Sequence, residues 1–118
     1  MDVGAPSNFE RLAALAGGQI EAVISVDDAH IRARMKTCFN ESAYIACPHT
    51  ATALEAFHQL DPALRQARRW IVGATAHPGK FADTVQAAIK HPVALPPALE
   101  AVLDRPVQCH ATAPDKRA

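Results

Sequence analysis

The fold prediction for this sequence depends on one stretch, residues 70–81, which reads WIVGATAHPGKF. Residues 70–76 are almost entirely apolar, and a continuous apolar run is typical of a strand that is covered on both faces. Pro78 and Gly79 then open a second apolar pattern, this time with helical spacing. We therefore predict an α/β fold in which a buried strand over about residues 70–76 leads directly into a helix.

Helical patterns occupy most of the remaining sequence. Apolar residues recur at helical spacing in five segments, namely residues 9–15, 28–40, 49–60, 81–89 and 98–103. The first segment follows a capping-box pattern at residues 7–10 and ends at Gly17-Gly18. Asp61-Pro62 ends the third segment. We expect about five helices and a single strand.

A single strand cannot satisfy its own backbone hydrogen bonds, because stable sheets commonly need three or more strands. The sequence barely supplies partners for the predicted strand. We therefore expect residues 1–118 to form one partial domain, a helix-rich piece of a larger fold. The polar tail after about residue 109 is expected to be loose.

Composition and charge exclude several classes of protein. The 118 residues carry 12 basic and 12 acidic side chains, so the formal net charge is zero and there is no basic excess for nucleic acid. The one dense basic cluster, residues 65–69, is typical of a solvated helix end. No apolar run approaches the roughly 18 residues of a membrane span, and the N-terminus lacks a secretory signal pattern. We expect neither a nucleic-acid partner nor a membrane.

The cysteines and histidines do not indicate a metal site. The three cysteines are widely spaced and odd in number, which argues against a disulfide framework and favours a reducing, cytoplasmic setting. The six histidines share no close ligand spacing. Cys47 and His49 form a single Cys-x-His pair with no second pair nearby. No metal site is predicted.

The turn that follows the predicted strand is the candidate ligand site. Thr75 offers a hydroxyl there, and His77 and Lys80 can donate hydrogen bonds. Ligands of open α/β sheets bind at the carboxyl ends of the strands. The chemistry alone leaves two alternatives open: a ligand-facing turn, or an ordinary strand-to-helix connection with a threonine cap.

Three stretches resemble segments of the threonine synthases and occur in that family's order. Residues 75–81 (TAHPGKF) resemble the family's Thr-Ala-His-Pro-x-Lys-Phe stretch. Residues 44–51 (YIACPHTA) resemble an acidic-Pro-His-Thr-Ala segment that precedes a helix. Residues 1–11 (MDVGAPSNFER) are similar to a Met-Asp-Val…Pro-Ser-Asn stretch that lies in mid-chain in the family. Together they cover the chain to about residue 105, so it resembles the C-terminal third of a threonine synthase.

The resemblance implies a fold, a cofactor and a reaction. Threonine synthases adopt the two-domain α/β fold called type II among pyridoxal-phosphate enzymes, and they convert O-phospho-L-homoserine to L-threonine and phosphate. In the family, the first threonine of the Thr-Ala-His-Pro stretch bonds the pyridine nitrogen of the cofactor. That role would fall to Thr75, with His77 and Lys80 as weaker neighbours. A neutral hydroxyl partner leaves the nitrogen largely unprotonated and moderates the ring as an electron sink.

Two segments of the family's site do not occur in this sequence. They are the Ser-Phe-Lys-Asp type segment, whose lysine forms the Schiff base with the cofactor, and the Gly-Asn-Phe-Gly phosphate loop. Lys36, Lys80, Lys90 and Lys116 do not match the Schiff-base position. Cys47 also stands where the family carries Asp or Glu, which changes the electrostatics near the ring. We therefore expect the chain alone to hold no catalytic residue and to bind no pyridoxal phosphate.

Three functional hypotheses follow from these patterns. The leading one is a C-terminal fragment of threonine synthase that is inactive alone and whose Met1 corresponds to an internal methionine of the family. The second is one chain of a split threonine synthase that is active with an N-terminal partner chain. The third is a small, non-catalytic helical interaction module. Because an unpaired strand edge templates association, we also expect marginal stability or self-association.

Overall fold

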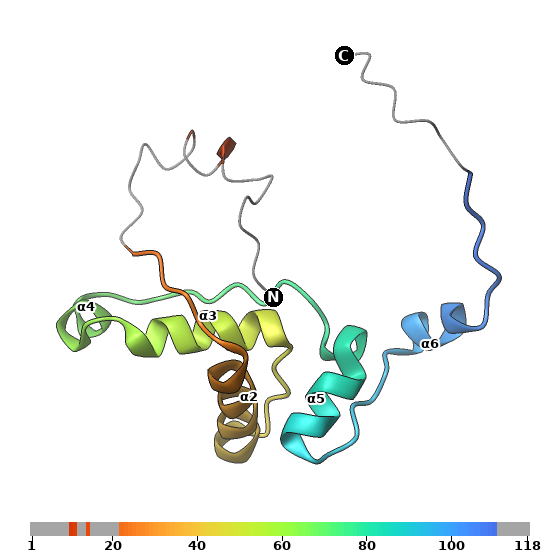
Figure 1. Ribbon diagram of the computed structural model, residues 1–118, viewed down its shortest axis with the longest axis horizontal. Coiled ribbons are helices and arrows are strands. Elements are labelled where there is room, and N and C mark those ends of the chain that lie inside the picture. Colours follow the sequence, from red (N-terminus) through yellow and green to blue (C-terminus); the bar gives the residue numbers. More distant parts are fainter. Residues whose placement is uncertain (1–9, 12–13, 15–21, 111–118) are drawn as a thin grey trace.

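The computed structural model describes residues 10–11, 14 and 22–110 (Figure 1). The predicted capping box, most of the helix expected over residues 9–15, the Gly17-Gly18 ending and most of the tail after residue 109 lie outside these residues. The predictions made for them stay predictions.

Over residues 22–110, the regular structure is entirely helical. It consists of α2 (Asp28–Ser42), α3 (Pro48–Gln59), α4 (Pro62–Ala67), the 3₁₀ turn η1 (Pro78–Phe81), α5 (Ala82–Ile89) and α6 (Pro97–Leu103). Figure 1 shows α2 and α5 below α3, with α4 and α6 at opposite ends of the molecule. The segment between α4 and η1 runs back along α3 without regular structure.

The predicted α/β fold, with its strand over residues 70–76, is wrong for the part of the chain that the structure describes. No strand occurs among residues 10–11, 14 and 22–110. Residues 70–76 are instead an extended, irregular segment, and the Ile71 side chain is 96% exposed. A continuous apolar run is typical of a buried strand, but a strand needs neighbouring strands to satisfy its backbone, and the regular structure among the described residues is helical.

Local sequence explains where the helices begin. The Asp27 carboxylate accepts a hydrogen bond from the His30 backbone amide at 2.9 Å, which caps α2 and lowers the pKa of Asp27. Asp61 caps α4 in the same way, accepting from the Ala63 amide at 2.7 Å. Pro62 lies at the first position of α4, where a backbone N–H would have no acceptor within the helix. Proline has no N–H, so it fits this position without loss of a hydrogen bond. Asp61-Pro62 therefore ends α3 as predicted and also begins a helix that the pattern did not reveal.

The core lies where α2 packs against α3 and α5. Six buried residues form it, namely Ile31, Met35, Ala46, Ala51, Val85 and Ile89. Met35 and Val85 are the largest of these with no exposed surface. Half-buried side chains, among them Phe39, Phe81 and Val93, pack around this centre. A core this small leaves little stability to lose, because small domains bury a smaller fraction of their surface.

One ion pair joins α2 to α3. The Arg34 Nε atom donates to the Glu55 Oε2 atom at 2.8 Å, and the two side chains are only 18% and 12% exposed. The hydrogen bond from Arg34 lowers the pKa of the Glu55 carboxyl below its ordinary value of 4.5, more than burial raises it. The pair therefore stabilises the folded state while Glu55 is ionised.

We expect Glu55→Gln to lower the free energy of unfolding by about 1–2 kcal/mol at pH 7. The substitution removes the charge from a hydrogen-bonded ion pair that is largely shielded from water. Since folding depresses the pKa of Glu55, its contribution is complete above pH 4.5 and disappears as the pH falls through the folded-state value. Urea unfolding at several pH values measures this. Glu41→Gln, at an exposed position of α2, is the control. Equal losses for both variants, or a loss independent of pH, would contradict the assignment.

Candidate functional site

The 3₁₀ turn η1 fixes the backbone of the candidate ligand segment. The His77 Nδ1 atom accepts a hydrogen bond from the Gly79 amide at 3.1 Å, and the Lys80 amide donates to the His77 carbonyl at 3.1 Å. A Cβ atom at Gly79 would lie 2.6 Å from the Leu95 Cδ2 atom and 3.1 Å from the His77 Nδ1 atom. A larger residue here would push the Leu95 side chain aside and crowd the His77 ring that accepts the Gly79 hydrogen bond. His77 has a structural role in this turn that the sequence did not indicate.

The three predicted site residues all lie at the surface. Thr75, His77 and Lys80 are exposed, and the Thr75 side chain makes no hydrogen bond to any residue that the structure describes. The Lys80 Nζ atom lies 5.8 Å from the centre of the Phe81 ring. Thr75 is therefore open to an external partner, His77 holds the turn that follows it, and Lys80 packs over an aromatic face.

A hollow of about 490 Å³ lies beside this turn. Its lining residues come from three stretches of the chain and are Tyr44, Ile45, Ala74, Ala76, His77, Pro78, Val93 and Ala94. Thr75 is not among them, although the residues on either side of it are. The hollow is mostly apolar, and Tyr44 and His77 are its lining residues with polar side-chain groups.

The two stretches at residues 44–51 and 73–81, far apart in the sequence, meet at this hollow. Tyr44 and Ile45 line it opposite the turn, and the rings of His49 and Phe81 lie 5.0 Å apart at a tilt of 53°. The His49 Nδ1 atom is buried and has no hydrogen-bond partner among the described residues. Sequence reasoning did not single out His49 as the residue that joins these stretches, and its place in the Pro-His-Thr-Ala segment was the available signal.

Cys47 begins α3 in the position where the resemblance places a carboxylate. The residue is 1% exposed, and its Sγ atom accepts from the Thr50 amide at 3.5 Å and lies 3.3 Å from the Thr50 Oγ1 atom. Aspartate is among the strongest residues at such a helix start, because its oxygen accepts the same amide hydrogen bond. The thiol therefore keeps the capping contact and removes the charge.

Two other kinds of site were searched for in the part of the chain that the structure describes. No group of three or more His, Cys, Asp or Glu side chains there could hold a metal ion. None of the described helices is long and apolar enough to cross a membrane. The three cysteines are all free thiols.

Comparison with known proteins assigns this chain to a family. The family model described as the C-terminal part of threonine synthase matches residues 50–118, which include all but the first two residues of α3 and the whole candidate turn. The chain therefore belongs to the threonine synthase C-terminal family, as its resemblance to three family segments indicated. No solved structure matches the chain.

Two curated relatives are both threonine synthases. The protein of Buchnera aphidicola subsp. Schizaphis graminum (strain Sg) is 28% identical over 120 residues, which cover 98% of this chain and 27% of the relative. The protein of Buchnera aphidicola subsp. Acyrthosiphon pisum (strain APS) is 29% identical over 115 residues, covering 93% of this chain and 26% of the relative. The chain thus spans about a quarter of the length of these relatives.

Proposed function

We propose that this chain forms the C-terminal part of a cytoplasmic threonine synthase and works only together with the rest of that enzyme. The reaction would be the conversion of O-phospho-L-homoserine to L-threonine and phosphate, with pyridoxal phosphate as cofactor. The meeting of residues 44–51 and 73–81 around one hollow carries the proposal. These two stretches are separated in sequence, and both resemble the family's segments.

The described residues fit one end of pyridoxal phosphate. The exposed Thr75 hydroxyl has no partner within the described chain and can donate a hydrogen bond, as an unprotonated pyridine nitrogen requires of its partner. A neutral partner at this nitrogen would leave it largely unprotonated. The cofactor, when bound, supplies an electron sink for carbanions formed on the substrate. The phosphate end would be held by residues outside the matched quarter of the family's length.

The residues that line the neighbouring hollow would shape the surroundings of that contact. The turn held by His77 and Gly79 fixes the backbone two residues after Thr75, which limits how far its hydroxyl can move. Tyr44 and Ile45 would exclude water from one side of the hollow. Such exclusion strengthens a hydrogen bond because the local dielectric constant falls.

We expect the chain alone to form no specific adduct with pyridoxal phosphate and no threonine, since it carries neither a lysine matching the family's Schiff-base position nor the phosphate loop. Titration with the cofactor, followed by borohydride reduction and peptide mapping, tests this. Slow modification scattered over several exposed lysines is expected, because a free aldehyde reacts with any accessible amine. A stoichiometric adduct at one lysine, together with threonine formation, would overturn the proposal.

A further inference from the structure

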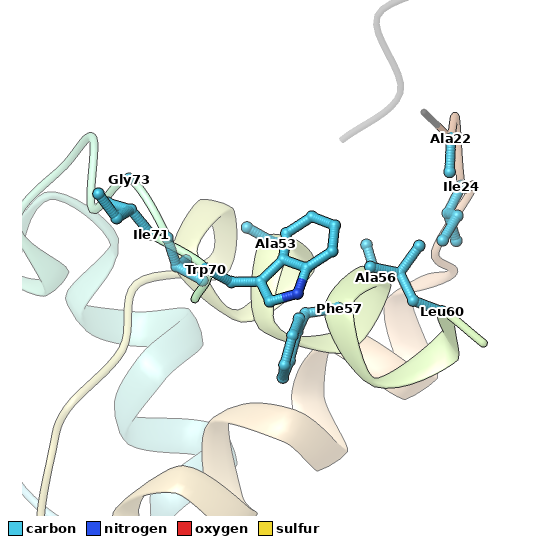
Figure 2. Close-up of a pocket in the computed structure, with 10 residues that line it drawn as sticks. Ala22, Ile24, Ala53, Ala56, Phe57, Leu60, Trp70, Ile71 and Gly73 are labelled. Atoms are coloured by element: carbon cyan, nitrogen blue, oxygen red, sulfur yellow. The ribbon is translucent and has the colours of Figure 1, made fainter. Parts of the chain in front are cut away.

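An apolar groove of about 380 Å³ runs along α3 on the side that faces the irregular segment (Figure 2). Ala53, Phe57 and Leu60 of α3 form its floor, as Figure 2 shows. Trp70 and Ile71 approach from one side of the groove, and Ala22 and Ile24 lie on the other. No charged residue lines it. A groove of this kind marks a site where another apolar surface binds.

The segment along the groove has unused hydrogen-bonding capacity. No backbone–backbone hydrogen bond involves residues 69–76 within the described chain, although these residues are extended. Trp70 holds this segment in place: its Nε1 atom donates to the Arg65 carbonyl at 3.2 Å, and its ring lies edge-on to Phe57 and 5.1 Å from the Arg68 guanidinium. Ile71 is 96% exposed. Such a segment combines apolar side chains with backbone groups that can bond a partner.

The groove and the hollow beside Thr75 share this segment. Residues 70–73 line the groove, and Ala74 and Ala76 line the hollow. A partner seated in the groove would therefore hold the same stretch of backbone from which Thr75 projects. Binding in the groove would therefore also restrain the Thr75 hydroxyl, because only Ala74 separates Thr75 from Gly73 of the groove.

We propose that this groove, together with residues 69–76, is the docking surface for the part of the threonine synthase polypeptide that lies outside the matched segment. The curated relatives are about four times as long as their match to this chain, so most of each relative remains available to cover the groove. The neutral, apolar lining favours a structural partner over a charged ligand. This inference rests on the proposed function and adds the surface through which the enzyme is completed.

The chain offers a single spectroscopic probe at the right place, because Trp70 is its only tryptophan. The chain labelled with 5-fluorotryptophan is titrated with the Schizaphis graminum strain relative from which the matching 27% has been deleted. We expect a saturable shift of the one ¹⁹F resonance and slowed hydrogen exchange of residues 69–76. An unchanged resonance at saturating concentrations of the truncated relative would overturn the proposal.

Two charge substitutions locate the surface. Ile71→Asp should weaken binding about tenfold or more, because it places an unpaired carboxylate in an apolar contact. Val107→Asp, at a position that is 89% exposed and outside the groove, should bind like the original chain. Both positions are exposed, so neither change disturbs the core. Equal binding by the two variants would contradict the assignment.

A second copy of this chain is the competing occupant. If sedimentation shows self-association that Ile71→Asp abolishes, while the truncated relative leaves the ¹⁹F resonance unmoved, the groove is a homodimer contact and the proposal is wrong. Binding is read separately from catalysis. Docking without threonine formation would therefore refute the proposed function and leave the docking surface standing.

Discussion

Met35→Ala is expected to lower the free energy of unfolding by about 2–5 kcal/mol, the range for truncating a fully buried large side chain. Met35 has no exposed surface and lies on α2, the helix that packs against both α3 and α5. Its removal leaves a cavity between all three helices. Because domains of this size are only marginally stable, this loss would unfold a large fraction of the chain. Urea denaturation followed by circular dichroism measures it.

Leu103→Ala is the matched control for this truncation. Leu103 lies at the end of α6 and is 60% exposed, so the same kind of deletion should change stability by no more than about 0.5 kcal/mol. Comparable losses for Met35→Ala and Leu103→Ala would show that α2 is not the centre of the core. Apolar surface elsewhere would then hold the helices together.

Thr75→Val is expected to reduce the rate of threonine formation by roughly 10- to 100-fold in a completed enzyme. This corresponds to a rise of about 1–3 kcal/mol in the activation free energy. The completed enzyme is the Schizaphis graminum strain relative with its matching segment replaced by this chain. Valine keeps the shape of threonine and removes the hydroxyl, which would leave the ring nitrogen unpartnered in a water-excluded pocket. In the isolated chain the same change should have little effect, because the exposed hydroxyl is free to bond water.

Two comparisons make the Thr75 result specific. Thr75→Ser keeps the hydroxyl and should retain most of the rate. Cys47→Asp, which restores the carboxylate that the family carries at this position, should raise the rate if the thiol is a damaging departure. An unchanged rate for Thr75→Val in an active chimera would show that the cofactor contact was assigned to the wrong residue.

Apart from α4, the helices from residue 28 to residue 103 could be predicted from the sequence because each depends on local signals. The apolar spacing of Ile31 and Met35 identified α2, and both residues are buried. Pro78-Gly79 and the spacing of Val85 and Ile89 identified the η1–α5 unit in the same way. Such apolar spacing indicates which face of a helix packs against the core. The indication does not depend on which elements form the rest of that core.

The segment at residues 70–76 could not be predicted in this way because its conformation depends on partners. A short apolar run fits a buried strand, a buried helix segment or an exposed docking surface equally well. Which conformation forms depends on whether a neighbouring backbone can accept and donate hydrogen bonds. The described helices provide no such neighbouring strand. The same holds for His49, whose contact with Phe81 appears only once α3 and η1 are placed together.

The proposal that this chain completes a threonine synthase is tested most directly with the chimera. The measurement is release of phosphate and threonine from O-phospho-L-homoserine by three proteins: this chain, the truncated relative, and the relative carrying this chain in place of its own matching segment. We expect activity for the chimera and none for either part alone. A folded, cofactor-loaded chimera that forms no threonine, or an isolated chain as active as the chimera, would contradict it.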